Sequence, residues 1–309
     1  MSADVHDSPP RGESAPDADA HLPDIDWTLL PPGTQRSRFS APSGDLAVTA
    51  LGDPRDPRVV LVPGATGSKE DFTLLAPLLA ESGYFVQSFD MAGQFESAHA
   101  APPPGGRYTY DVFVDDLLSF LESGPTAHVL GYSFAGIVAE LALVARPDLF
   151  LSLTLLTAPP QTGQSFRGIR GIGPLSWIAP PRIGAALMIW GIVTNKNKVP
   201  PGRITFVRAR FEKTNRESVV DIIRLMRTIP DVRAAVSVSH VPVLVATGTR
   251  DLWPTRLHRS NARALGARLV VFRTGHSPCE TAPHQLASAM IALFTENSSP
   301  STGTADTRE

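Results

Sequence analysis

The stretch His128-Val129-Leu130-Gly131-Tyr132-Ser133-Phe134-Ala135-Gly136 joins a short apolar run to a segment rich in small, helix-forming residues. The apolar run predicts a buried strand, and the segment after Ser133 predicts a helix. A serine between the two lies on a sharp strand-to-helix turn, which imposes unusual backbone angles and therefore requires small neighbours. We expect this turn to hold the Ser133 hydroxyl clear of the sheet, beside the N-terminus of a helix.

Strand and helix patterns alternate on both sides of this turn. The expected strands are 38–41, 46–51, 59–62, 84–89, 127–130, 150–156, 241–246 and 268–272, and the expected helices are 69–81, 110–122, 134–145, 256–265 and 284–295. Such alternation is typical of βαβ units. It predicts an α/β fold class, with a mostly parallel central sheet flanked by helices.

Composition divides the chain into a core and three other parts. Residues 1–35 are rich in Pro, Asp, Ala and Ser and predict a disordered acidic N-terminal arm, and residues 297–309 predict a disordered tail. The β–α alternation occupies 36–160 and 236–296 and is absent from 161–235. We therefore expect 161–235 to be an inserted helical lid above the sheet.

The expected lid contains two helical patterns, around 205–213 and 218–228, and an apolar stretch that includes Trp190. This stretch is either the core of the lid or an acyl-binding surface. Residues 161–240 carry thirteen Lys and Arg against four acidic residues. Their charge is either a solvated basic face or a basic rim that attracts anionic substrates or the acidic arm.

Composition also excludes several classes of protein. The chain is 42% hydrophobic and 19% charged, as expected for a soluble globular protein, and its single cysteine, Cys279, excludes an internal disulfide. No apolar run reaches the roughly 18 residues of a membrane span, and the first residues do not resemble a secretory signal. We therefore expect a cytoplasmic protein. No basic and aromatic motif indicates a nucleic-acid partner, and the oligomeric state is not indicated.

Three side chains follow strands at the same edge of the predicted sheet. In a parallel sheet, ligands gather at the carboxyl ends of the strands, where Ser133, Asp251 and His276 each lie on a turn. A serine is a poor nucleophile unless a base takes its proton and an acceptor orients that base. The order Ser, Asp, His is the one expected when the nucleophile lies on such a turn.

These residues give the chain a resemblance to the α/β-hydrolase fold superfamily, in its lid-bearing branch, over roughly 45–160 and 240–296. The motifs that carry it are Val62-Pro63-Gly64, Asp90-x-x-Gly93, Gly131-Tyr132-Ser133-Phe134-Ala135-Gly136, Gly248-x-x-Asp251 and Gly275-His276. The resemblance implies that Ser133 is the nucleophile, His276 the general base and Asp251 the residue that orients His276. It also implies an oxyanion hole made by the backbone N–H groups of Ala65 and Phe134.

Two residues depart from the family's usual pattern. Pro63 stands where histidine is common, and Ala135 stands where a second glycine is common after the serine. A backbone donor does not need the histidine, and one extra methyl group is tolerated if the helix shifts slightly. Both departures affect the expected class of substrate more than the expected type of reaction.

Each candidate has a simpler structural alternative. Ser133 could be a turn residue of an inactive member, Asp251 a helix N-cap, and His276 a loop hydrogen-bonding residue. Tyr132, Trp253 and Trp190 are candidate pocket residues, although core packing explains Trp253 equally well. The residues expected to be merely packed or solvent-exposed are Cys279, Asp115, Asp116, His258 and His284.

The sequence thus predicts a serine hydrolase that cleaves a carboxylic ester through an acyl-enzyme. Its expected partner is a small-molecule substrate of anionic or acyl-bearing character, with no cofactor and no metal, since no cysteine pair or metal-binding histidine spacing occurs. Two alternatives remain open. The same residues could pass the acyl group to another acceptor, as in an acyltransferase or cofactor-free perhydrolase, or the fold could bind a ligand with little turnover.

Overall fold

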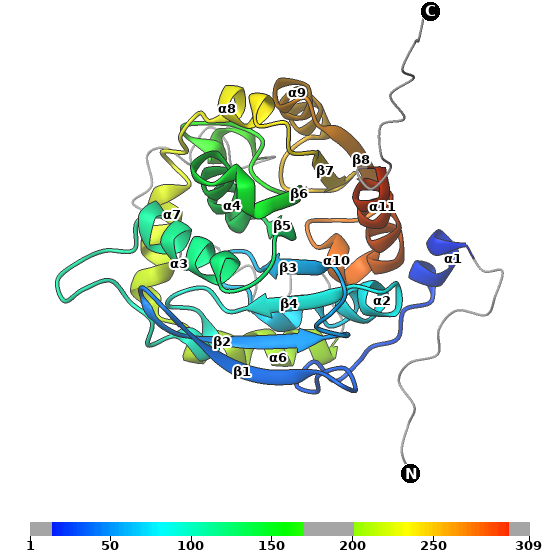
Figure 1. Ribbon diagram of the computed structural model, residues 1–309, viewed down its shortest axis with the longest axis horizontal. Coiled ribbons are helices and arrows are strands. Elements are labelled where there is room, and N and C mark those ends of the chain that lie inside the picture. The colour runs from blue at the N-terminus through cyan, green and yellow to red at the C-terminus, as the bar shows by residue number, and fades with distance from the viewer. Residues whose placement is uncertain (1–13, 170–200, 297–309) are drawn as a thin grey trace, which may run out of the picture.

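The computed structural model describes residues 14–169 and 201–296. Eight strands form one sheet in the order β1-β2-β4-β3-β5-β6-β7-β8 (Figure 1). The β1–β2 and β2–β4 pairs are antiparallel and the five other pairs are parallel, which confirms the predicted sheet. The strands are β1 (Gln35–Ala41), β2 (Gly44–Leu51), β3 (Arg58–Val62), β4 (Phe85–Phe89), β5 (Ala127–Tyr132), β6 (Phe150–Leu156), β7 (Val243–Gly248) and β8 (Arg268–Phe272).

Helices cover both faces of this sheet. The α-helices in the described ranges are α1 (Ala15–Ala20), α2 (Leu75–Glu81), α3 (Tyr110–Glu122), α4 (Phe134–Ala145), α6 (Pro201–Lys213), α7 (Arg216–Leu225), α8 (Arg233–Val238), α9 (Thr255–Leu265), α10 (Pro278–Thr281) and α11 (Pro283–Glu296). Short 3₁₀ helices are η1 (Lys69–Phe72), η2 (Phe95–Ser97), η3 (Pro147–Leu149) and η4 (Ser165–Gly168). None of the helices in these ranges is long and apolar enough to cross a membrane.

The apolar run of β3 is continuous because both faces of the sheet are buried. Val60 and Val62 lie in a core cluster that includes residues of α3, α4, α8 and α9. Val59 and Leu61 point to the opposite face, into a second cluster with residues of α2 and α11. Successive side chains of a strand alternate between faces, so this one strand contributes to both layers.

The helix expected over 69–81 is divided into η1 and α2. The Ser68 side chain and the Asp71 side chain form a capping box at the start of η1, and the Thr73 hydroxyl donates to the Glu70 carbonyl at 2.8 Å. These local bonds favour a short, tight first turn over a continuous α-helix.

The described part of the N-terminal arm differs from the disorder expected over 1–35. Helix α1 lies beside α11 (Figure 1). Both carboxylate oxygens of Asp19 accept hydrogen bonds at the start of α11, from the backbone N–H groups of His284 at 2.9 Å and Gln285 at 3.1 Å. The unpaired N–H groups at a helix N-terminus favour a carboxylate. The acidic arm therefore provides, in Asp19, a carboxylate that binds to another helix of the same chain.

Trp27 anchors the same arm by apolar burial. Its side chain is buried with Phe95 and Phe206 in a small separate cluster. The guanidinium of Arg203 lies over the Trp27 ring, 4.4 Å from its centroid, and such a cation–π contact adds to the apolar burial. One aromatic residue within a polar stretch therefore fixes a segment whose average composition predicts disorder.

Candidate active site

Ser133 lies at the turn between β5 and α4, with backbone angles of φ 53° and ψ −119°. Its neighbours must be small because the turn is crowded. A Cβ atom on Gly131 would lie 2.6 Å from the Ala135 carbonyl oxygen, and one on Gly136 would lie 2.4 Å from Ala158 Cβ. Ala135 is fully buried, so its methyl group is accommodated in the core. The strained serine turn expected from the sequence is present.

Ser133, His276 and Asp251 form a chain of hydrogen bonds. The Nε2 atom of His276 lies 3.1 Å from Ser133 Oγ, and its Nδ1 atom lies 2.5 Å from Asp251 Oδ1. Asp251 follows β7 and His276 follows β8, so both come from the carboxyl ends of adjacent parallel strands. The Thr157 hydroxyl donates to the His276 carbonyl at 2.8 Å and holds the histidine loop against β6.

Asp251 is buried and ionised. Burial opposes ionisation, but hydrogen bonds from His258 and His276 outweigh it and lower the pKa of Asp251 to about 2. Because a carboxylate only accepts hydrogen bonds, the Nδ1 atom of His276 must carry a proton. In a neutral imidazole the Nε2 atom is then free to accept the Ser133 proton, which is the tautomer that a general base requires.

The depressed pKa of Asp251 predicts a pH-dependent contribution to stability. A carboxyl group whose pKa is lower in the folded state stabilises the fold above its usual pKa and loses this effect as the pH falls. Between about pH 5 and pH 2, unfolding free energy should fall by about 2 kcal/mol more in the wild type than in Asp251→Asn. Urea denaturation across this range measures the difference. Parallel pH curves for the two proteins would contradict it.

His258 was expected to be a surface residue, and this expectation is wrong. Its side chain is 1% exposed, and its Nε2 atom lies 2.6 Å from Asp251 Oδ2. In α9, His258 precedes two buried residues, Ala262 and Leu265, by four and seven positions. This spacing places all three on one helix face, and it is the signal by which the sequence could have indicated burial.

The loop after β3, residues 63–67, lies against the serine turn. A Cβ atom on Gly64 would lie 3.0 Å from Ser133 Cβ, so glycine permits this close approach. The Thr66 N–H donates to Gln94 Oε1 at 2.9 Å, and Gln94 Nε2 donates to the Ser218 hydroxyl at 2.6 Å. The loop is thus held from β3 on one side and from α7 on the other. Its Ala65 is partly buried, and Phe134 is the first residue of α4.

The candidate pocket residues have different surroundings. The Tyr132 hydroxyl lies 2.8 Å from Ser277 Oγ, and its ring centroid lies 5.6 Å from that of His276. Burial raises the pKa of Tyr132 well above its usual value, so its phenol stays neutral. Trp253 is 1% exposed and donates its indole N–H to the Ser165 carbonyl at 2.8 Å. Trp190 lies outside the described residues.

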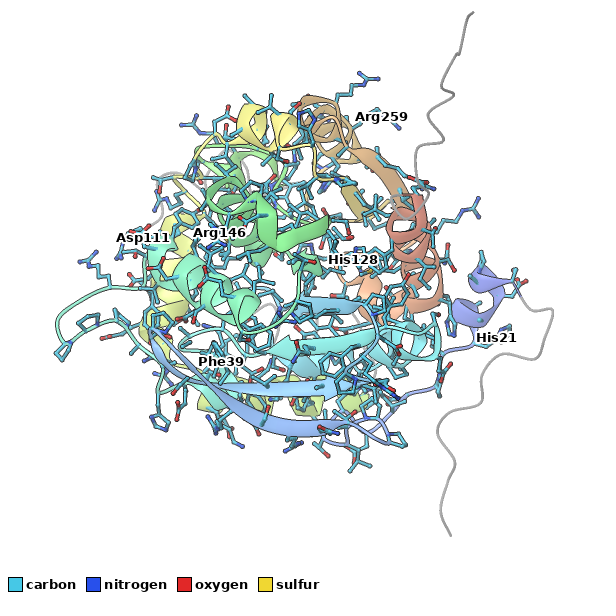
Figure 2. All side chains as sticks on the ribbon, in the orientation of Figure 1. His21, Phe39, Asp111, His128, Arg146 and Arg259 are labelled. Carbon is cyan, nitrogen blue, oxygen red and sulfur yellow. The ribbon has the colours of Figure 1, made fainter. Side chains whose placement is uncertain are left out.

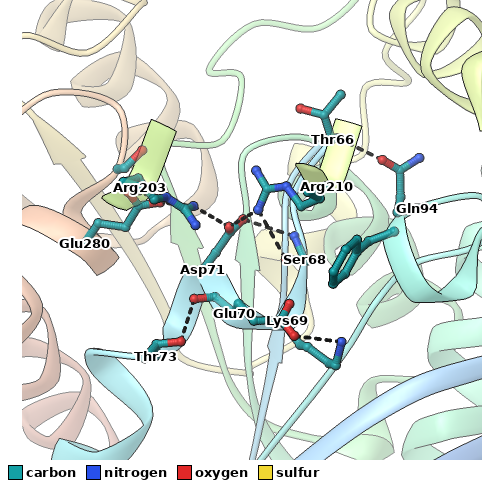
Figure 3. A network of polar contacts seen from close by, with 12 residues as sticks. Thr66, Ser68, Lys69, Glu70, Asp71, Thr73, Gln94, Arg203, Arg210 and Glu280 are labelled. Atoms are coloured by element: carbon teal, nitrogen blue, oxygen red, sulfur yellow. Dashed lines mark hydrogen bonds and ion pairs between the residues drawn. The ribbon is translucent and has the colours of Figure 1, made fainter. Parts of the chain in front are cut away.

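A buried ionic network links α6 to η1 and α10 (Figure 3). The carboxylate of Asp71, in η1, accepts from Arg203 at 2.6 Å and from Arg210 at 2.5 Å, and Arg203 also pairs with Glu280 of α10 at 2.5 Å. The Arg210 guanidinium donates to Ser68 Oγ at 3.2 Å. These two arginines belong to the basic segment 161–240, and they are buried ion-pair partners rather than part of a solvated face.

A second cluster surrounds Lys69, whose ammonium lies 2.8 to 3.1 Å from carboxylate oxygens of Glu70, Asp90 and Glu96. Burial and the neighbouring Glu70 raise the pKa of Asp90 to about 7, although Lys69 opposes the shift. A cavity of about 700 Å³ opens beside this cluster, and Ser133, Asp251 and His276 are not among its lining residues. Its lining includes five basic residues, Arg36, Arg38, Lys69, Lys213 and His99, and one acidic residue, Glu96.

Several other titratable residues have structural roles. Asp116 was expected on a solvated helix face, but it is buried and accepts hydrogen bonds from Ser43 N at 3.0 Å and Ser43 Oγ at 2.6 Å. Burial raises the pKa of Asp116 to about 6. His128 lies inside the molecule, whereas Asp111 and Arg259 project from its periphery (Figure 2). Cys279 is a buried free thiol, as expected.

His284 was also expected at the surface, and it is partly buried with its Nδ1 atom 2.9 Å from Asp19 Oδ1. Within residues 14–169 and 201–296, no group of three or more His, Cys, Asp or Glu side chains is arranged to hold a metal ion.

Comparison with known proteins agrees with the fold. A family model described as the alpha/beta hydrolase family matches residues 59–289. The human "Serine hydrolase-like protein" is 28% identical over 124 residues, which make up 40% of this chain and 60% of that protein. The match therefore spans less than two thirds of that relative.

Solved structures with the same fold include a hydrolase from Pseudomonas aeruginosa PA01, at 23% identity and a TM-score of 0.69, covering 84% of this chain and 98% of that one. The enol-lactonase from Burkholderia xenovorans LB400 is similar at 19% identity and a TM-score of 0.69. The match covers 84% of this chain and 100% of that one. At these identities the likeness concerns the fold alone.

Proposed function

Because this chain belongs to the alpha/beta hydrolase family, we propose that it is a hydrolase and that it cleaves the carboxylic ester of a small molecule through an acyl-enzyme on Ser133. The observation that supports this proposal is the unbroken series of hydrogen bonds from Ser133 Oγ through His276 to the buried Asp251. A hydroxyl on a strained turn, with a base in reach and an ionised acceptor behind that base, is the arrangement that activates a serine.

In the first half of the reaction, Ser133 Oγ attacks the ester carbonyl carbon while His276 Nε2 takes its proton. The resulting imidazolium is stabilised by the ionised Asp251, which stays deprotonated. When the tetrahedral intermediate collapses, the bond to the alcohol oxygen breaks and His276 gives its proton to the departing alcohol. The acyl group remains on Ser133 as an ester.

In the second half, His276 takes a proton from water as the water oxygen attacks the acyl carbon. The bond to Ser133 Oγ then breaks, the proton returns to that oxygen, and a carboxylic acid leaves. In both halves the carbonyl oxygen becomes negatively charged. We assign the stabilisation of this oxyanion to the backbone N–H groups of Phe134 and Ala65. The close approach of Gly64 to Ser133 supports this assignment, and one such donor stabilises a transition state by roughly 3–4 kcal/mol.

The insertion is proposed to act as a lid that shapes the substrate pocket. Its described helices contact three segments that follow strands β8, β3 and β4, through Arg203 to Glu280, Arg210 to Asp71 and Ser218 to Gln94. A cover at this edge excludes water from the reacting atoms and strengthens electrostatic interactions there. Tyr132 and Trp253, whose rings lie 5.6 Å and 6.0 Å from the ring of His276, are proposed to border the acyl group.

Labelling by a fluorophosphonate tests the proposal without knowledge of the natural substrate. The probe reacts when serine oxygen attacks phosphorus and fluoride leaves, with the proton passing through the base. We expect the folded wild-type chain to be labelled, and peptide mapping to place the phosphonyl group on Ser133. A folded chain that stays unlabelled would contradict the proposal. Turnover that requires an added alcohol or peroxide would assign the acyl group to an acceptor other than water.

A further inference from the structure

The carboxylate of Asp251 is held by two imidazole rings, one on each oxygen. Its Oδ1 atom binds His276 Nδ1 at 2.5 Å, and its Oδ2 atom binds His258 Nε2 at 2.6 Å. The His258 side chain is 1% exposed and that of Asp251 is 0% exposed, so no solvent competes for these bonds. His258 comes from α9, the helix that follows the Asp251 loop.

The second hydrogen bond has a geometric consequence. A carboxylate with a partner on one oxygen can turn about its Cβ–Cγ bond, because this torsion is broad. Turning it here would break a charge-assisted bond in a buried site, where such bonds are strong and their loss is costly. Since Asp251 is an acceptor only, the Nε2 atom of His258 carries the proton that makes this bond.

The loop that carries Asp251 is fastened independently of His258. The backbone N–H of Asp251 donates to the Gly248 carbonyl at 3.2 Å, and that of Arg250 donates to the Thr274 carbonyl at 3.0 Å. Two residues after Asp251, the indole of Trp253 is buried and bonded to Ser165. The backbone therefore has its own anchors, and the bond from His258 acts on the orientation of the carboxylate.

We propose that His258 is a positioning residue, which fixes the plane of the Asp251 carboxylate so that Asp251 holds His276 in line with Ser133. This inference rests on the proposed function, because it concerns how the proposed base is oriented. The His258 imidazole bonds to Asp251 and not to Ser133, so it acts on the nucleophile only through Asp251. Its removal should therefore slow the chemical step and leave substrate affinity nearly unchanged.

Three replacements of His258 separate hydrogen bonding from packing. In His258→Gln the side-chain amide nitrogen reaches the position of the imidazole Nε2, whereas in His258→Asn it falls short, and His258→Leu has no donor. We expect His258→Asn and His258→Leu to lower kcat for p-nitrophenyl acetate and the fluorophosphonate labelling rate by about 10- to 100-fold, with KM within about 2-fold. His258→Gln should restore both rates to within about 5-fold of the wild type.

A second buried histidine provides the matched control. His128 is 6% exposed and its Nδ1 atom lies 2.8 Å from Ser152 Oγ, at the end of β5 farthest from Ser133. We expect His128→Asn to keep the wild-type labelling rate even where it lowers the melting temperature. Equal labelling rates in the wild type and all three His258 variants would overturn the role of His258 but not the proposed function. The same holds if His258→Gln is slowed as much as His258→Asn. An unlabelled wild type would overturn the proposed function itself.

Discussion

Replacing Ser133 by alanine is expected to lower kcat for hydrolysis of p-nitrophenyl acetate by roughly 10⁴- to 10⁶-fold. The substitution removes the oxygen on which the acyl-enzyme forms, and neither His276 nor Asp251 can replace it. The rate that remains should come from the oxyanion donors and from binding alone, which still exceed the reaction in water. Steady-state kinetics, corrected for the reaction without enzyme, measures the loss.

The other members of the hydrogen-bonded chain should behave as one unit with Ser133. His276→Ala should lose nearly as much activity, and Ser133→Ala/His276→Ala should lose hardly more than either single variant, since groups that act together are strongly non-additive. Ser152→Ala is a suitable control, because Ser152 is a buried serine on the neighbouring strand β6. All four proteins should keep the wild-type circular dichroism spectrum. Wild-type turnover in both Ser133→Ala and His276→Ala would disprove the assignment of the nucleophile and the base.

The core of the fold was predictable because its signals are local and repeated. The continuous apolar run of β3 and the helical spacing of α3 and α4 each indicate their own structure, and alternation along the chain indicates a parallel sheet. The ordered part of the N-terminal arm was not predictable in this way. Asp19 and Trp27 find partners on α11 and α6, far away in the sequence, and composition averaged over a window cannot register such contacts.

The candidate site was predictable to the extent that it lies on strand ends. Ser133, Asp251 and His276 follow strands of one parallel sheet, and the topology of such a sheet brings their turns to one edge. His258 and Asp71 were missed because each lies within or at the start of a helix, where a polar residue is usually solvated. Their burial depends on which helix face packs inward, and for Asp71 on arginines more than 130 positions later in the chain.

Replacing Asp71 by asparagine is expected to lower the free energy of unfolding by about 3–5 kcal/mol. Asp71 is 2% exposed and is the shared partner of Arg203 and Arg210, which are 3% and 5% exposed. Although burial opposes its ionisation, the two guanidinium groups hold the pKa of Asp71 below its usual value. Without this charge Arg203 keeps its pair with Glu280, whereas Arg210 loses the carboxylate with which it pairs. Urea denaturation near neutral pH measures the loss.

A matched ion pair at the surface distinguishes burial from charge as the cause. Asp53 pairs with Arg55 at 2.5 Å, but the Arg55 side chain is 89% exposed, and exposed pairs contribute little because water and salt screen them. Asp53→Asn should therefore leave the urea midpoint unchanged. An equal, small loss in Asp53→Asn and Asp71→Asn would show that the buried network is not stabilised by its central carboxylate.

A double-mutant cycle then assigns the cost to the uncompensated cation. Arg210→Met replaces a buried guanidinium by an apolar side chain and leaves Arg203 paired with Glu280. If Asp71→Asn is costly because it leaves Arg210 without an anion, then Asp71→Asn/Arg210→Met should lose less stability than the sum of the single variants. The expected difference is about 1–3 kcal/mol, the range for residues in direct contact within one network. Additive losses would mean that Asp71 and Arg210 stabilise the fold independently. In that case α6 would be held mainly by the apolar cluster of Trp27, Phe95 and Phe206 rather than by charge.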